Sequence, residues 1–195
     1  MAKRQRLGVA LLAAGSSRRF GSADKLAQPF RGRLLGEHAA RAIPLELFKN
    51  AWVITSIGGH PCEPGWIDAG FEPVINPKAH EGLSASVVMA AKLAEANRCD
   101  ALLIALADMP LVSTGHFSAL ANLSTHGQDI FVSARGDARM PPAIFGKDHF
   151  VTLSELEGDT GARDLLAAGT PVVCPPDWLI DIDTPEALQK YGQST

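Results

Sequence analysis

Short apolar segments alternate with segments of helical periodicity along most of the chain. Several of the apolar segments are uniformly apolar, which is typical of strands buried on both faces of a parallel sheet. Strands are expected at residues 7–13, 51–56, 73–76, 101–106, 130–134, 143–145, 172–174 and 179–182. Helices are expected at residues 34–42, 86–97, 115–123, 150–156, 161–168 and 185–191. This alternation predicts a three-layer α/β fold with a mostly parallel sheet.

The segments that follow the expected strands are the places where chemistry is expected. In open α/β sheets, ligands bind beyond the carboxyl ends of the strands. The last helix also has a well-marked start, because Thr184 can cap it, Pro185 suits the first helical position and Glu186 is an acid in the first turn. Residues 179–184 therefore lead from the last expected strand into the last expected helix.

The composition is that of an ordinary globular protein and excludes several classes of function. The chain has 195 residues, of which 46% are hydrophobic and 20% charged, and we expect one domain over residues 1–195. A net charge of −3 gives no basic footprint for nucleic acid, and apolar segments such as 101–107 are far too short to span a membrane. The scattered Cys62, Cys99 and Cys174 form neither a disulfide framework nor a zinc motif, which favours a reducing, cytoplasmic location.

The loop after the first expected strand has the composition of a phosphate site. Small residues around Gly15 let the backbone approach a bulky anion, and Arg18, Arg19 and Lys25 supply positive charge. The spacing matches neither a P-loop nor the glycine pattern of dinucleotide-binding proteins. The loop therefore indicates a nucleoside triphosphate site of another kind, and the alternative is an ordinary glycine turn with solvated arginines.

Two aspartates follow apolar segments and are candidates for holding a metal ion. Asp108 comes directly after the strand 101–106, and Asp183 comes at the end of the segment 179–182. Carboxylates at strand ends can hold Mg²⁺ over a phosphate. Asp181 shares a face with Asp183 if the segment is extended. The alternatives are that Asp108 starts a turn and that Asp183 or Thr184 only caps the last helix.

Two further segments place polar groups at helix starts. Gly82, Ser84 and Ser86 lie near the start of the helix 86–97, where free N–H groups and hydroxyls can contact a ribose or a base, unless a serine is a plain cap. Asp159 and Arg163 lie at the start of the helix 161–168. Arginine is unusual there because the helix dipole favours anions, so Arg163 either helps to bind an anionic substrate or is an ordinary surface side chain.

Five segments, taken together and in order, resemble one family. They are LAAGSSRRFGSADKL at 12–26, EGLSAS at 81–86, LADMP at 106–110, GDTGAR at 158–163 and DIDTPE at 181–186. The chain is similar to molybdenum cofactor cytidylyltransferases, within the wider group of MobA-like nucleotidyltransferases. The resemblance covers nearly the whole chain and implies an α/β/α Rossmann-like fold with a mixed, mostly parallel sheet.

The resemblance implies a role for each candidate residue. Lys25, Arg19 and Asp108 are the implied catalytic residues, Asp108 and Asp183 the implied Mg²⁺ ligands, and Asp159 and Arg163 the implied contacts to the second substrate. The implied nucleotide-binding residues are Leu12, Ala13, Ala14, Gly15, Ser17, Arg19, Lys25, Gly82, Ser84 and Ser86. Guanylyl-transferring relatives usually carry glycine at the position of Ala14, so alanine favours CTP over GTP. The sequence Arg-Met-Pro-Pro at 139–142 departs from the family's usual Gly-His-Pro, which affects the acceptor pocket.

The implied reaction is cytidylyl transfer. A phosphate of molybdopterin attacks the α-phosphorus of CTP, pyrophosphate leaves, and catalysis consists mainly of positioning and charge neutralisation. The attacking phosphate is already ionised, so no general base is needed, which agrees with six histidines that form no catalytic pattern. Two alternatives stay open: transfer from GTP or another nucleotide to a different phosphorylated acceptor, and a carrier that delivers finished cofactor to a molybdoenzyme or its maturation factor.

Overall fold

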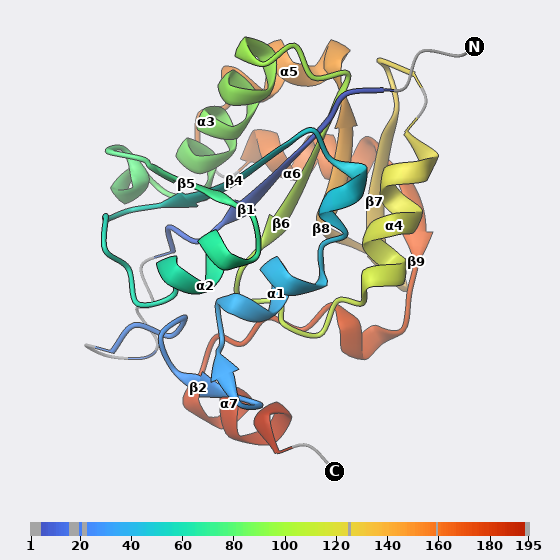
Figure 1. Ribbon diagram of the computed structural model, residues 1–195. Helices are drawn as coiled ribbons and strands as arrows, with labels where there is room; N and C mark the ends of the chain where they lie inside the picture. The colour runs from blue at the N-terminus through green and yellow to red at the C-terminus, as the bar shows by residue number, and fades with distance from the viewer. Residues whose placement is uncertain (1–4, 16–19, 21–22, 125, 159, 194–195) are drawn as a thin grey trace.

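A seven-stranded mixed sheet in the order β5-β4-β1-β6-β8-β7-β9 forms the centre of the protein (Figure 1). The computed structural model describes residues 5–15, 20, 23–124, 126–158 and 160–193. The strands of this sheet are β1 (Leu7–Leu12), β4 (Asn50–Thr55), β5 (Glu72–Ile75), β6 (Ala101–Leu106), β7 (Ile130–Arg135), β8 (Ala138–Gly146) and β9 (Thr170–Val173). Strand β8 runs antiparallel to β6 and β7, and the other pairings are parallel. The predicted mixed, mostly parallel sheet is confirmed.

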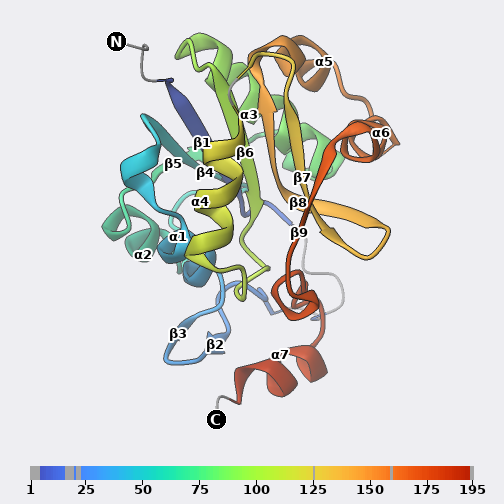
Figure 2. The same cartoon turned by 90° about the vertical axis from the view of Figure 1, so that its right-hand side faces the viewer.

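Helices cover both faces of this sheet. They are α1 (Glu37–Ala42), α2 (Glu63–Asp68), α3 (Leu83–Ala96), α4 (Thr114–Leu123), α5 (Phe150–Ser154) and α6 (Thr160–Ala168). Val9 and Leu11 of β1 pack into a core with α1, α2 and α4, whereas Ala10 and Leu12 pack into a second core with α3, α5 and α6. Figure 2 shows α1, α2 and α4 on one side of the sheet and α5 and α6 on the other. Because β1 is covered on both sides, every residue of it is buried, which explains its uniformly apolar sequence.

A smaller third core lies beyond the edge of the sheet. It joins the two-stranded ribbon β2 (Pro29–Phe30) and β3 (Arg33–Leu34) to the last helix, α7 (Pro185–Gly192), which lie side by side in Figures 1 and 2. Its fully buried members are Phe30, Leu35 and Ile182. Short 3₁₀ helices complete the connections; they are Leu45–Leu47, Ala79–Glu81 (η3), Lys147–His149 and Pro176–Trp178 (η5).

The structure differs from the predicted elements in three places. Residues 179–182 form no strand but an irregular segment after η5, and Leu179 and Ile182 are apolar because each packs into a core. The ribbon β2–β3 and helix α2 were not predicted. The sequence did not predict helix α2 because Pro61, Pro64 and Gly65 are residues typical of a turn. Its Trp66 is nevertheless completely buried.

Backbone hydrogen bonds bring the chain segments of interest to the carboxyl edge of the sheet. The Ala13 N–H donates to the carbonyl of Ile54 (2.8 Å), and the Ala107 N–H donates to the carbonyl of Leu12 (3.0 Å). The Ile182 N–H donates to the carbonyl of Asp108 (2.9 Å), which holds the segment 179–182 beside the end of β6. Among the described residues, no helix is long and apolar enough to cross a membrane.

Candidate active site

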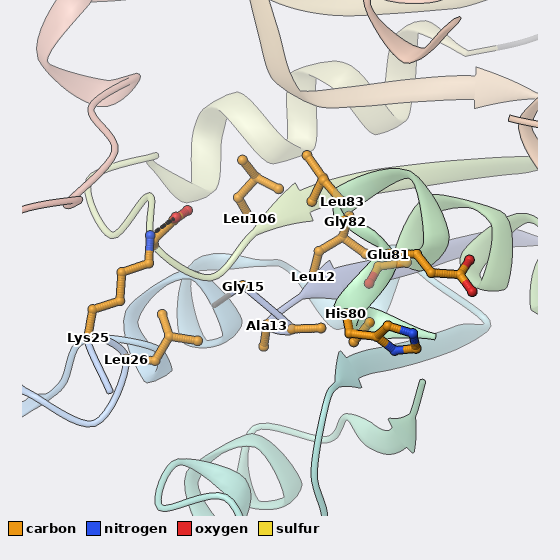
Figure 3. A pocket seen from close by; sticks show the side chains of 14 residues that line it. Leu12, Ala13, Gly15, Lys25, Leu26, His80, Glu81, Gly82, Leu83 and Leu106 are labelled. Carbon is orange, nitrogen blue, oxygen red and sulfur yellow. Dashed lines mark hydrogen bonds and ion pairs between the residues drawn. The ribbon is translucent and has the colours of Figure 1, made fainter. Parts of the chain in front are cut away.

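A cavity of about 560 Å³ lies where β1 and β6 end (Figure 3). In Figure 3, Lys25 and Leu26 lie on one side of it, and His80, Glu81 and Leu83 lie on the other. The residues that line it are Leu12, Ala13, Ala14, Gly15, Lys25, Leu26, Ala79, His80, Glu81, Gly82, Leu83, Ser86, Leu106 and Asp108. The segment after β1, the segment before α3 and the end of β6, all singled out from the sequence, therefore meet around one cavity.

The start of α3 differs from the sequence expectation. The helix begins at Leu83 rather than Ser86, and Gly82 precedes it with φ +116° and ψ −174°, a backbone conformation that favours glycine. No side chain caps this helix, so the alternative of a plain serine cap is wrong. Ser86 lines the cavity but is 2% exposed, and its Oγ accepts a hydrogen bond from Asn76 Nδ2 (3.3 Å). Ser84 lies outside this cavity and lines a separate groove on the other side of α3.

Lys25 lies between two of the predicted site residues. Its Nζ donates to Asp108 Oδ2 (2.5 Å) and to Asp183 Oδ1 (2.6 Å). The Lys25 side chain is 9% exposed, whereas those of Asp108 and Asp183 are 20% and 39% exposed. The tertiary structure thus gathers the end of β6, the loop before β2 and the segment before α7 into one charged cluster. We call these three residues the Lys25 cluster.

The electrostatics of the cluster favour a bound cation. Burial by itself would lower the pKa of Lys25, but the charges and hydrogen bonds of Asp108 and Asp183 outweigh it and raise that pKa above its usual range. Asp181 is exposed, but the protein atoms packed around its carboxyl group exclude part of the solvent. This desolvation, which is the larger cause, and the negative charges of Asp108 and Asp183 together raise the pKa of Asp181 to about 6. The carboxylates of Asp108, Asp181 and Asp183 therefore lie close enough to repel one another.

The Lys25 cluster also has the donor set for a divalent cation. Asp108 Oδ1 is buried and has no hydrogen-bond partner among the described residues, so the acceptor capacity of this carboxylate oxygen is unused. Across the described parts of the chain, no group of three or more histidine, cysteine and acidic side chains can enclose a metal ion. Mg²⁺ is commonly held by one or two carboxylates together with substrate phosphates and water, so Asp108 and Asp183 fit that ion.

A second, polar cavity of about 440 Å³ adjoins the cluster at Asp183. It is lined by Arg135, Met140, Pro176, Asp177, Leu179, Ile180, Asp181, Asp183 and Tyr191. These residues come from the β7–β8 hairpin, from η5 with the segment that follows it, and from α7. The Lys25 cluster therefore borders two cavities, because Lys25 and Asp108 line the first and Asp183 lines the second.

The remaining predicted residues divide into two groups. Ser17, Arg19 and Asp159 lie outside the described residues. Arg163 is described: it is exposed on α6 and lines neither cavity. Asp24 was not predicted as a site residue and His60 was assigned no role, yet His60 Nε2 lies 2.6 Å from Asp24 Oδ2, next to Lys25. The position of Asp24 directly before Lys25 is a signal that could have drawn attention to it.

Comparison with known proteins agrees with this geometry. Residues 9–172 match the family model of the MobA-like NTP transferase domain. The chain belongs to this family. It is 33% identical to the purine catabolism protein PucB of Bacillus subtilis (strain 168), over 92% of each chain. The likeness to the MobA-like nucleotidyltransferases and the enzyme class expected from it are thereby confirmed: the protein is a nucleotidyltransferase.

Solved structures share the fold of this MobA-like protein. A nucleotidyl transferase from Methanothermobacter thermautotroptrophicus superposes with a TM-score of 0.80 at 21% identity, over 96% of each chain. A CMP:2-keto-3-deoxy-manno-octonic acid synthetase, solved in complex with CTP, superposes with a TM-score of 0.67 at 13% identity, also over 96% of each chain. At these identities the likeness shows the fold alone.

Proposed function

We propose that this nucleotidyltransferase transfers CMP from CTP to a phosphate of a molybdopterin-type acceptor and releases pyrophosphate. The observation that carries the proposal is the position of the Lys25 cluster, which borders both a nucleotide-sized cavity and a second, polar cavity. A reaction between two phosphate-bearing substrates needs this arrangement, because positive charge must lie where the two phosphates meet.

The nucleotide is assigned to the first cavity. Ala13 and Ala14 follow β1 there, and the backbone of Gly15 is exposed, with no atom of the described residues within 4 Å of the position of a Cβ apart from its chain neighbours. A phosphate chain can therefore approach the backbone at Gly15 closely. Guanylyl-transferring relatives usually carry glycine at the position of Ala14, so the alanine that lines this cavity supports CTP rather than GTP.

The acceptor is assigned to the second cavity. Arg135 is its cation, suited to an anionic group, and Asp177 and Asp181 are acceptors for amino and ring N–H groups such as those of a pterin. Met140 lines the same cavity and belongs to the segment 139–142 that departs from the usual family sequence. The departure therefore falls in the part of the site assigned to the acceptor.

Lys25, Asp108 and Asp183 are proposed to carry the main charge changes of this transfer. The ammonium of Lys25 leaves the carboxylates for the β- and γ-phosphates of the nucleotide, and offsets the charge that develops on the leaving pyrophosphate. Asp108 and Asp183 are the residues that would hold Mg²⁺, and the ion would supply positive charge to phosphate oxygens. The acceptor phosphate is ionised at neutral pH, so no residue has to remove a proton from it. The predicted Arg19, which lies outside the described residues, is proposed to assist Lys25.

The cellular setting is proposed on chemical grounds. Cys62, Cys99 and Cys174 are all unpaired, which supports a reducing compartment such as the cytoplasm. A molybdopterin product would be passed to a molybdoenzyme or to its maturation factor, so one of these is the expected protein partner.

The test is pyrophosphate release with Mg²⁺ and molybdenum-loaded molybdopterin, with CTP, GTP, ATP and UTP compared in parallel. We expect release with CTP, and loss of it in Asp108→Asn, which keeps the size of the side chain but removes its charge. An exposed acid far from the cluster, Glu46→Gln, is the matched control and should retain activity. Release with GTP alone would overturn the base assignment. Tight binding of CMP-molybdopterin without turnover would favour a carrier.

A further inference from the structure

We propose that His60 and Asp24 form a positioning pair that fixes the backbone on both sides of Lys25, so that its ammonium can reach bound phosphate. The inference rests on the proposed function only in assigning a phosphate chain to Lys25. His60 lines a shallow surface depression on α2 and not the nucleotide cavity, so it touches neither proposed substrate. Any effect of His60 on phosphate binding must therefore be indirect.

The orientation of the His60 ring is determined from three sides. Its Nδ1 accepts a hydrogen bond from the Cys62 N–H (3.0 Å), and its Nε2 lies 2.6 Å from Asp24 Oδ2. Because Nδ1 is an acceptor, the neutral ring carries its proton on Nε2 and donates it to Asp24. The ring also stacks on the indole of Trp66, with centroids 4.7 Å apart and planes at 24°. His60 is 5% exposed, so few other ring orientations are open to it.

Trp66, on which the His60 ring stacks, is itself held in place. Trp66 is completely buried, and its Nε1–H donates to the carbonyl of Gly36 (2.8 Å). Helix α2, which carries Trp66, is thereby joined to the start of α1. His60 thus transmits the position of a rigid, buried part of the structure to Asp24.

Asp24 in turn fixes the chain around Lys25. Its second carboxylate oxygen, Oδ1, accepts a hydrogen bond from the Leu26 N–H (2.9 Å), so one side chain holds the residues before and after Lys25. The carbonyl of Asp24 accepts from Gln28 Nε2 (2.9 Å), and the carbonyl of Leu26 accepts from Cys62 Sγ (3.1 Å). The hydrogen bond from His60 lowers the pKa of Asp24, so this carboxylate stays charged to a lower pH than an ordinary aspartate.

A fixed backbone on both sides of Lys25 limits the positions that its ammonium can reach. A lysine has four rotatable side-chain bonds, so the position of its ammonium depends on where the backbone starts and in which direction it points. In the proposed reaction the ammonium must move from Asp108 and Asp183 to phosphate, so the backbone must stay fixed while the side chain turns. A displacement of about 1 Å at such a group can cost on the order of 100-fold in rate.

The experiment measures binding of Mg²⁺–tripolyphosphate by calorimetry, a probe that needs neither the base nor the acceptor. His60→Phe keeps the stacking on Trp66 but removes the Nε2–H donor, and His60→Gln restores a donor at similar reach. We expect about tenfold weaker binding in His60→Phe and Asp24→Asn, and a loss of less than about threefold in His60→Gln. Asp24→Asn retains the acceptor for the Leu26 N–H, so it tests the pair even if His60→Phe fails to fold.

A double-mutant cycle with Lys25→Met decides whether the pair acts through Lys25. We expect His60→Phe/Lys25→Met to bind no more weakly than Lys25→Met alone, within about twofold. An additional tenfold loss in the double variant, or unchanged binding in both His60→Phe and Asp24→Asn, would overturn the proposal. The proposal would also be overturned if the wild-type protein bound Mg²⁺–tripolyphosphate no more tightly than Lys25→Met does. Lys25-dependent binding without turnover of CTP would leave the positioning role standing and refute the proposed function instead.

Discussion

Replacing Lys25 by methionine tests the charge balance at the centre of the proposed site. In the wild-type protein the Lys25 ammonium lies 2.5 Å from Asp108 and 2.6 Å from Asp183. Methionine fills similar space but leaves two carboxylates facing each other without that ammonium. We expect the variant to be less stable and to bind Mg²⁺ more readily in the absence of nucleotide, because the metal ion no longer competes with the ammonium.

The magnitude follows from the burial of the three groups. Removing one partner of a fully buried ion pair costs about 3–5 kcal/mol. The side chain of Lys25 is 9% exposed, but that of Asp183 is 39% exposed, so solvent relieves part of the repulsion. A loss of about 2 kcal/mol is therefore expected. For a chain of this size it corresponds to a decrease of about 4–8 °C in Tm.

The assay is thermal unfolding of the wild type, Lys25→Met and a control, with increasing MgCl₂ and with NaCl at matched ionic strength. Lys147→Met is the control, because this lysine is exposed and lies outside the site. A ligand that binds only the folded state stabilises it by RT ln(1 + c/Kd), where c is the free ligand concentration, so Tm rises further for the protein that binds the ligand more tightly. We expect Mg²⁺ to raise the Tm of Lys25→Met more than that of the wild type or of Lys147→Met.

Two results would refute this reasoning. If Lys25→Met unfolds at the same temperature as Lys147→Met, the contacts to Asp108 and Asp183 contribute nothing net to stability. If Mg²⁺ raises the Tm of all three proteins equally, the Lys25 cluster does not bind the metal ion, and the assignment of Asp108 and Asp183 as ligands fails.

Three further predictions concern other parts of the molecule. Ala14→Gly should lower the preference for CTP over GTP by about tenfold, because one methyl group in a binding pocket changes discrimination by about that much; the ratio of kcat/KM values measures this. Asp24→Asn should be less stable than the wild type at neutral pH. The difference should vanish as the pH falls below 3.8, because the lowered pKa of Asp24 stabilises the fold only while Asp24 is charged; urea unfolding against pH measures this. Burial raises the pKa of Cys62 to about 12 and of Cys99 to about 11, and also raises that of Cys174. Ellman's reagent at mildly alkaline pH should therefore react slowly with the folded protein and fast with the unfolded chain.

The sequence determined the local elements of this protein and the chemistry of its strand ends. Strands such as β1 and β6 were predictable because a strand covered by helices on both faces is apolar at every position. Asp108 was predictable as a site residue because a carboxylate directly after such a strand lies at the ligand-binding edge of the sheet. These inferences need only neighbouring positions in the chain and the common rules of α/β folds.

Only the tertiary structure decided which distant residues meet. The segment around Asp183 looked like a strand because Leu179 and Ile182 are apolar, but they are apolar because each packs into a core. The contacts of Lys25 with Asp108 and Asp183 join residues 83 and 158 positions apart, and no local pattern encodes such distances. The pairing of His60 with Asp24 likewise depends on how α2 packs against the chain before β2. Periodicity records which face of an element is buried, whereas a site depends on which elements share an edge, and packing alone decides that.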